Sequence, residues 1–386
     1  MPPPERPIYL DHNATTPLLP EVVDAMLPYL REQFGNPSSS HPWGSRARAA
    51  VDTAREKVAA LVHADVDEIY FTSGGTESSN LAIRGVASAA AQRRHLLTTA
   101  IEHPATANPC RQLERHGWHV DWIGVDQACR VRLDQLDSRL SEDTALVSVI
   151  HANNETGTVQ PIREIAALAR RSGALVHIDA AQSVGKIGVD VRSLDVDLLT
   201  IAGHKLNAPK GVGALYVRRA TAIEPFARGA GHERGLRPGT ENVASIVGLG
   251  VACAIASSTR EERARHLCEL RDRLWALLAA GIKDVKKNGH DTEQLPNTLS
   301  VRFPRVRGTV LLDAVPEIAA STGSACHEGQ ESASEVILAT GLTATDALET
   351  VRLSVGLTTT MEEIERAASA LVRAWSSLAS DGGGVR

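Results

Sequence analysis

The sequence is poor in the features that mark disulfide-rich, zinc-binding and nucleic-acid-binding proteins. Its five cysteines are odd in number, scattered and never paired as Cys-x-x-Cys, which argues against a disulfide framework and against a cysteine zinc site. Aromatic residues make up only 3% of the chain and the formal net charge is −5, whereas binding to nucleic acid or anionic membrane favours an excess of Lys and Arg. We therefore expect no direct nucleic-acid partner, no membrane and no metal site.

Long apolar runs are also missing. No stretch approaches the roughly 18 apolar residues that a membrane span needs, and residues 1–7, with four prolines, lack the apolar region of a secretory signal. We expect a cytoplasmic protein. With 386 residues, 43% hydrophobic and 23% charged, the chain has ample material for a core, and its length predicts two or three domains.

Short β-rich apolar runs alternate with helical patterns up to about residue 257. Apolar residues recur at three- and four-residue spacing in the predicted helices. Such alternation predicts an α/β fold with a mainly parallel sheet covered by helices, and ligands bind such sheets at the carboxyl ends of the strands. The predicted helices span 47–62, 76–91, 105–116 and 162–172, and the predicted strands span 69–72, 96–100, 145–151, 174–179, 198–202 and 213–218.

Beyond residue 257 the pattern changes. A charged helix is predicted over 260–280, followed by a strand near 298–303, a helix, another strand and a final helix near 361–379. We predict a large domain over residues 16–257 and a smaller α+β domain over 258–386 that also contains residues 1–15.

Two predicted strand ends carry residues suited to a pyridine cofactor with an aldehyde group. Lys205 follows the strand that ends at Ala202, and burial can lower a lysine pKa enough for Schiff-base formation. Asp179 can keep a ring nitrogen protonated, and Gln182 can hydrogen-bond a ring hydroxyl. Taken singly, Lys205 is equally compatible with an ordinary surface lysine. Asp179 is likewise compatible with an aspartate that caps a helix.

Two further strand ends suit the remaining parts of such a ligand. Thr72-Ser73-Gly74-Gly75-Thr76-Glu77 places glycines before a helix, where free backbone N–H groups and the helix dipole attract a phosphate. His103, in Glu102-His103-Pro104, can stack on a flat ring or move protons. The first pattern is equally typical of a βα turn, and a lone histidine is more often structural.

One cysteine lies in an unusual setting. Cys326 is surrounded by small residues in 321–329, which predicts an exposed, flexible loop, although cysteine is usually buried. The adjacent His327 favours the reactive thiolate. The same stretch is compatible with a glycine-rich turn that happens to contain a cysteine. The other four cysteines are expected to be small buried residues.

In this order and spacing the motifs resemble those of the cysteine desulfurases. The resemblance spans nearly the whole chain, beginning with Leu10-Asp11-His12-Asn13-Ala14-Thr15-Thr16-Pro17. Such a set of ordered motifs rarely arises by coincidence. The other matching segments are 34–39, 72–80, 151–157, 203–205, 233–237, 322–326 and 351–354.

The resemblance implies an aspartate-aminotransferase-like large domain, a small C-terminal domain, a homodimer and pyridoxal 5'-phosphate as cofactor. It implies that Lys205 forms the Schiff base, Asp179 partners the pyridine nitrogen, and His103 stacks on the ring and moves protons. Arg352 holds the substrate carboxylate, which suits the planar guanidinium fork. The remaining contacts are Gln182 and Asn154 to the ring hydroxyl, Asn154 also to substrate, Gly75, Thr76 and His204 to the phosphate, and Thr240 to the partner subunit's phosphate.

By the same resemblance, the enzyme converts L-cysteine to L-alanine and keeps the sulfur as a persulfide on Cys326. The loop at 322–326 is similar to the longer, mobile loop of the housekeeping and nitrogen-fixation desulfurases, which must carry sulfur from the site to an acceptor. The expected acceptor is an iron–sulfur scaffold, a tRNA-thiolation enzyme or a DNA-phosphorothioation enzyme.

Alternative functions on the same scaffold are a selenocysteine lyase and an aminotransferase, although the latter has no use for a cysteine in a mobile loop. A non-catalytic assembly partner should have lost at least one of the residues that carry chemistry, and all are present. Four positions depart from the family pattern and are expected to tune cofactor affinity or the dimer interface: Ala202, Ala208, His232 and Pro238.

Overall fold

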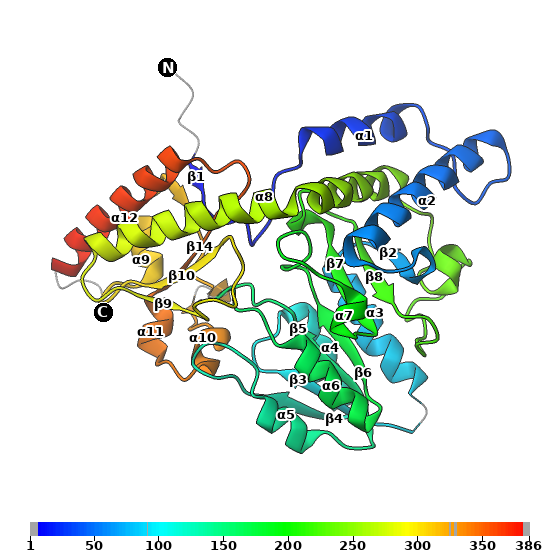
Figure 1. Ribbon diagram of the computed structural model, residues 1–386, viewed down its shortest axis with the longest axis horizontal. Coiled ribbons are helices and arrows are strands. Elements are labelled where there is room, and N and C mark those ends of the chain that lie inside the picture. The colour runs from blue at the N-terminus through cyan, green and yellow to red at the C-terminus, as the bar shows by residue number, and fades with distance from the viewer. Residues whose placement is uncertain (1–6, 91, 324–325, 328–329, 381–386) are drawn as a thin grey trace.

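The computed structural model describes residues 7–90, 92–323, 326–327 and 330–380. A seven-stranded sheet in the order β2-β8-β7-β6-β5-β3-β4 forms the centre of the larger part (Figure 1). Strand β8 is antiparallel to both of its neighbours, and the other neighbouring pairs are parallel. The strands are β2 (Ile69–Thr72), β3 (His95–Thr99), β4 (His119–Ile123), β5 (Thr144–Ile150), β6 (Leu175–Asp179), β7 (Leu198–Ala202) and β8 (Gly213–Val217).

The predicted α/β class and mainly parallel sheet are confirmed. All six predicted strands are present within one residue of their expected bounds, whereas the edge strand β4 was not predicted. The helices of this part are α1 (Pro20–Arg31), α2 (Pro42–Val62), α3 (Gly75–Ala89), α4 (Pro104–Arg115), α5 (Leu133–Arg139), α6 (Ile162–Ser172) and α7 (Val191–Leu194).

Alternating strand residues bury both faces of the sheet. In β7, Leu199 and Ile201 pack in the cluster that contains buried residues of α2 and α6, whereas Leu198 packs in the cluster that contains α3. Because successive side chains of a strand point to opposite faces, a run of apolar residues fills both layers.

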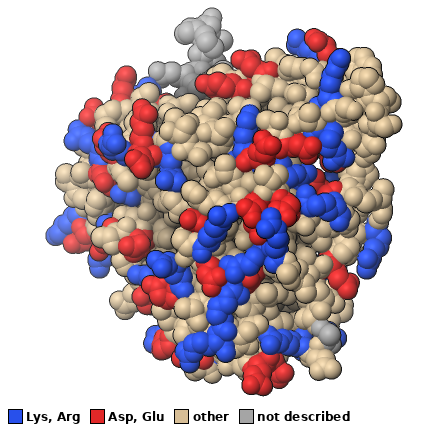
Figure 2. All heavy atoms as spheres, turned by 45° about the vertical axis from the view of Figure 1, so that its right-hand side comes forward, with Lys and Arg blue, Asp and Glu red and all other residues tan. Residues whose placement is uncertain are grey.

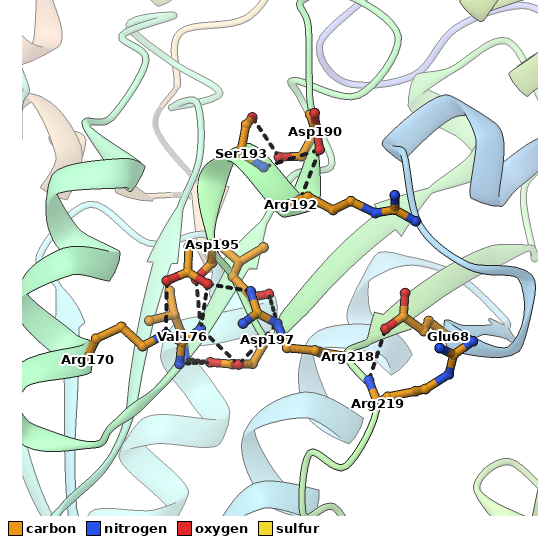
Figure 3. A network of polar contacts seen from close by, with 11 residues as sticks. Glu68, Arg170, Val176, Asp190, Arg192, Ser193, Asp195, Asp197, Arg218 and Arg219 are labelled. Atoms are coloured by element: carbon orange, nitrogen blue, oxygen red, sulfur yellow. Dashed lines mark hydrogen bonds and ion pairs between the residues drawn. The ribbon is translucent and has the colours of Figure 1, made fainter.

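A polar network ties α6 to the strands beside it (Figure 3). Buried Asp197 accepts hydrogen bonds from both terminal nitrogens of Arg170, at 2.7 and 2.9 Å, and from the backbone N–H of Val176 at 2.8 Å. Arg218 donates to Asp195 at 2.7 Å, and Arg170 also contacts Asp195. The network therefore fixes the loop that leads into β7.

The smaller part of the chain has its own antiparallel sheet, in the order β14-β10-β9. Its buried cluster includes Phe303, Leu353 and Trp375. The strands of this sheet are β9 (Lys286–Asn288), β10 (Thr298–Arg302) and β14 (Thr350–Ser354), and the helices are α9 (Gly308–Asp313), α10 (Glu335–Ala339), α11 (Ala344–Leu348) and α12 (Met361–Ser380). Two short strand pairs lie outside this sheet. They are β1 (Ile8–Tyr9) with β11 (Ile318–Ala319), and β12 (Cys326–His327) with β13 (Gln330–Glu331).

One long helix, α8 (Val243–Gly281), joins the two parts (Figure 1). The predicted helix over 260–280 is the second half of α8, so the predicted boundary after residue 257 falls inside a continuous helix. Residues up to Ala256 pack in the core of the large sheet, and residues from Leu267 pack in the core of the small one. We propose a division into two domains at this point of α8.

The expectation that no stretch approaches the length and apolar character of a membrane span was wrong for α8, which by length and composition alone could cross a membrane. Half of its most apolar window is buried inside the structure, where it packs against α1 and α2. A core helix of a folded domain has this burial.

On the surface, acidic and basic side chains lie side by side over the face shown in Figure 2.

The polar network gives a first prediction. Replacing Asp197 by Asn leaves the arginine charges without their buried carboxylate, which should lower the free energy of unfolding by about 3 kcal/mol. The matched control is Asp137→Asn, which removes the exposed pair with Arg171 and should cost less than about 1 kcal/mol. Urea unfolding of both variants measures the difference, and equal effects would contradict a special role for the network.

Candidate active site

The carboxyl ends of the strands open into one cavity of about 630 Å³. Both parts of the chain contribute to it, because Lys205 follows β7 and Arg352 lies on β14. The structure brings together most of the residues predicted from the sequence. Those that line the cavity are Gly75, Thr76, His103, Asn154, Asp179, Gln182, His204, Lys205 and Arg352.

Two residues that the sequence predicted to belong to the site are not among the described residues that line the cavity. Thr240 is exposed, outside the cavity of its own chain. Cys326 lies in β12, where its backbone pairs with Glu331, and its side chain falls outside the described residues. On either side of this hairpin, Ser334 donates to Glu155 at 2.5 Å, and a Cβ added to Gly323 would lie 2.5 Å from the same carboxylate oxygen.

One end of the cavity is built to hold an anion. Helix α3 begins at Gly75, and its N-cap residue Gly74 has φ +148°, a conformation that side chains rarely adopt. Nothing lies within 4 Å of a Cβ placed on Gly74, and Gly74, Gly75 and Thr76 all line the cavity. The residues present therefore fit a phosphate group.

Ala202 is one of the four positions that depart from the family pattern, and the structure shows what its side chain packs against. A Cβ added to Gly75 would lie 3.1 Å from the methyl group of Ala202. The end of β7 is thus packed directly against the start of α3. An apolar methyl group here supplies no hydroxyl to the anion, whereas Ser73, Thr76 and His204 are polar side chains that also line the cavity.

The middle of the cavity carries a buried acid and a histidine. Asp179 ends β6, and its Oδ1 accepts a hydrogen bond from the backbone N–H of Ala181 at 3.0 Å. Burial raises the pKa of Asp179, while His103 and Lys205 oppose that rise. Nδ1 of His103 accepts from the N–H of Ala105 at 3.1 Å, so neutral His103 carries its proton on Nε2. Burial lowers the pKa of His103.

Lys205 is held by backbone carbonyl groups. Its Nζ donates to the carbonyl oxygens of Asn13 and Ala14, at 2.5 and 2.7 Å. Burial, with the nearby charge of Arg352, lowers the pKa of Lys205 to about 8. Its amine is therefore far more often neutral, and so nucleophilic, than that of an ordinary lysine.

The smaller part of the chain contributes a guanidinium group to the cavity. Arg352 donates to Asp11 at 2.7 Å and to the carbonyl oxygen of Asn154 at 3.2 Å. Its buried Nε has no partner among the described residues. Because Arg352 lines the cavity, its guanidinium is placed to bind a carboxylate there.

Sequence reasoning missed a second buried lysine beside the site. Nζ of Lys186 donates to Oε1 of Gln182 at 2.8 Å and to Oδ1 of Asn13 at 3.1 Å. Burial lowers the pKa of Lys186 to about 7. Nε2 of Gln182 in turn donates to the carbonyl oxygen of Asn13, which fixes the orientation of the amide. The four-residue spacing from Gln182 to Lys186 was the available signal.

Glu102, next to His103, was also not singled out. Its Oε1 accepts hydrogen bonds from Thr99 at 2.6 Å and from the N–H of Ile150 at 2.8 Å, whereas Oε2 is buried without a partner among the described residues. Burial raises the pKa of Glu102 to about 8. The carboxyl group therefore ties β3 to β5 behind the histidine, mainly in its protonated form at neutral pH.

Three of the four remaining cysteines confirm the expectation of inert, buried thiols. Cys110, Cys129 and Cys253 are buried, and burial raises the pKa of each thiol, to about 12 for the first two. Cys268 is only partly buried. None of these four lines the cavity.

Comparison with known proteins agrees with this geometry. Residues 8–367 match the family model of the class-V aminotransferases. The chain is 47% identical over 361 residues to a cysteine desulfurase of Trichormus azollae, covering 93% of this chain and 90% of the relative.

Solved structures show the same fold. A NifS-like protein superposes with a TM-score of 0.91 at 36% identity, covering 96% of this chain and 100% of that one. The protein SspA in complex with cysteine superposes with a TM-score of 0.78 at 34% identity, covering 90% and 98%. The chain therefore belongs to the cysteine desulfurases, a pyridoxal-phosphate-dependent group within the class-V aminotransferase family.

Proposed function

We propose that the protein is a pyridoxal-phosphate-dependent cysteine desulfurase that releases L-alanine and keeps the sulfur as a persulfide on Cys326. The observation that carries this proposal is the single cavity in which Lys205, Asp179, His103 and Arg352 meet. The similar SspA structure contains cysteine, which supports the same substrate here.

The residues of the cavity fit the parts of the cofactor. Pyridoxal phosphate, when bound, supplies an aldehyde for an amine and a ring that withdraws electrons from the substrate. The start of α3 would hold its phosphate, and Asp179 would accept a hydrogen bond from its ring nitrogen. Lys205 and His103 favour the ionised form of Asp179 that this contact needs.

Two groups are placed to move protons. With a pKa of about 8, Nζ of Lys205 exchanges a proton readily near neutral pH. Nε2 of His103 is the other carrier, because its Nδ1 is occupied by the N–H of Ala105. Arg352 orients the substrate by its carboxylate, and Asp11 holds the guanidinium in place.

The sulfur step requires no external oxidant. The thiolate of Cys326 attacks the sulfur of the bound cysteine, an S–S bond forms, and the bond from carbon to sulfur breaks. Its electron pair stays with the substrate carbon, which takes up a proton on the way to alanine. We propose that a cytoplasmic acceptor protein then takes the persulfide sulfur, with an iron–sulfur scaffold, a tRNA-thiolation enzyme and a DNA-phosphorothioation enzyme as the expected classes.

A homodimer is part of this proposal. Thr240 lies outside its own cavity and is exposed, as expected of a residue that completes the partner's phosphate site. Exposed apolar side chains also gather at the start of α2, where the rings of Phe34, before the helix, and Trp43, in its first turn, stack at 5.1 Å and are 76% and 47% exposed. A second copy of the chain would cover this surface.

Replacing Cys326 by Ala should abolish turnover without loss of the cofactor. We expect alanine release from L-cysteine to fall at least about 1,000-fold, because the nucleophile is gone, while the visible absorbance of the bound cofactor remains. The matched control is Cys268→Ala, which removes the partly buried one of the four other cysteines and should keep normal activity. Turnover by Cys326→Ala at the normal rate would refute the persulfide step.

The lowered pKa of Lys205 predicts how the apoenzyme captures its cofactor. At pH 7 about a tenth of the molecules carry a neutral Lys205 amine, against about three in ten thousand for an ordinary lysine. The reconstitution rate should therefore rise about tenfold from pH 6 to pH 7 and level off above about pH 8. Stopped-flow absorbance measures the rate, and a pH-independent rate would contradict the assignment. Lys205→Arg should bind the cofactor without developing the Schiff-base absorbance.

Light scattering tests the dimer. The parent should have about twice the chain mass of 41.2 kDa. The double variant Phe34→Glu, Trp43→Glu should shift toward the single-chain mass, because it places charge in the proposed interface. Phe226→Glu alters another exposed aromatic residue and should leave the mass unchanged. A monomeric parent would refute the dimer.

A further inference from the structure

Two histidines and an aspartate meet at the edge of the large sheet. Nε2 of His95 and Nε2 of His119 lie 3.2 and 3.4 Å from Oδ2 of Asp121. One possible ligand atom from each residue lies within 4.8 Å of those from the other two, and the two imidazole ring centres are 5.0 Å apart. Among the residues that the structure describes, this is the one cluster of possible metal ligands with such spacing.

Strand register brings these side chains together. β3 and β4 are parallel neighbours at the sheet edge (Figure 1), and His95 is the register partner of His119. Asp121 follows His119 by two residues, so both project from the same face. His95 begins β3, which places the cluster at the amino end of the strands. The catalytic cavity lies at the carboxyl end, so the two sites are separate.

The spacing fits a small tetrahedral ion. Zn²⁺ bonds imidazole nitrogen and carboxylate oxygen at about 2.0–2.1 Å, which separates adjacent ligand atoms by about 3.3 Å. The distances of 3.2 and 3.4 Å agree with that separation. Binding requires the two imidazole nitrogens to settle at a similar distance from each other, and the exposed His119 side chain is free of packing that would prevent it.

The surroundings resemble those of ligating groups. Nδ1 of His95 lies 2.9 Å from the hydroxyl of Thr144, an outer partner of the kind that orients a metal-binding imidazole. His95 and Asp121 are buried whereas His119 is exposed, so an ion can enter from solvent.

We infer that His95, His119 and Asp121 form a binding site for a divalent transition-metal ion, with water completing the coordination. Imidazole donors select Zn²⁺, Cu²⁺ and Ni²⁺ over Mg²⁺ and Ca²⁺. A bound ion would link β4 to β3 and thereby stabilise the edge of the sheet.

Arg139 opposes the ion. It donates to Oδ1 of Asp121 at 2.5 Å and is itself largely exposed. Its positive charge repels a cation, but it leaves Oδ2 facing the histidines. Removing that charge should therefore strengthen metal binding.

Zinc titration of the holoenzyme tests the site. The protein carries no histidine tag and has Cys326→Ser, so that the reactive thiol cannot compete. Calorimetry should show one Zn²⁺ ion per chain and no heat with Mg²⁺, and Zn²⁺ should raise the melting temperature. X-ray absorption at the zinc edge should show nitrogen and oxygen ligands without sulfur.

Variants separate this site from other zinc binding. His119→Ala should weaken binding at least tenfold and remove the rise in melting temperature, and Arg139→Gln should tighten binding. His116→Ala, which removes another exposed histidine, should bind as the parent does. No saturable binding, or binding that His119→Ala leaves intact, would overturn the inference. Normal desulfurase turnover by His119→Ala with Cys326 restored shows that the variant folds.

Discussion

The parallel arrangement of β5, β6 and β7 is the constraint on which the candidate active site depends. Their carboxyl ends lie side by side at the same end of the sheet. The residues that follow these strands are therefore brought together, although they are tens of residues apart in sequence. Asn154, Asp179 and Lys205 reach the cavity in this way. Burial at this end then lowers the pKa of Lys205 to about 8. The fold thus supplies both the placement and the reactivity of the amine.

This constraint explains how much the sequence could predict. Apolar runs located six strands of the sheet, and the polar residues at their ends pointed to most of the cavity. The edge strand β4 was missed because His119 and Asp121 interrupt its apolar pattern. The start of α8 was missed because the apolar 243–259 stretch has no charged face, which a buried core helix does not need.

What the sequence could not predict are contacts between segments far apart in the chain. Asn13 accepts hydrogen bonds from both Lys186 and Gln182, although 173 and 169 residues separate it from them. The metal-ligand cluster likewise depends on the register between β3 and β4, which no local pattern specifies. Cysteine spacing could exclude a thiolate zinc site, but it carries no information about histidines on neighbouring strands.

Residues 11–14, which precede α1, contact both the lysine that would bind the cofactor and the arginine that would bind the substrate carboxylate. Carbonyl groups of Asn13 and Ala14 accept hydrogen bonds from Lys205, and Asp11 of the same segment holds Arg352. Asn13 also bonds Thr298 in the small sheet. A shift of β14 relative to β7 would therefore disturb the amine and the carboxylate-binding guanidinium together. Since the substrate must meet both groups at once, this shared segment sets the distance between its two points of attachment.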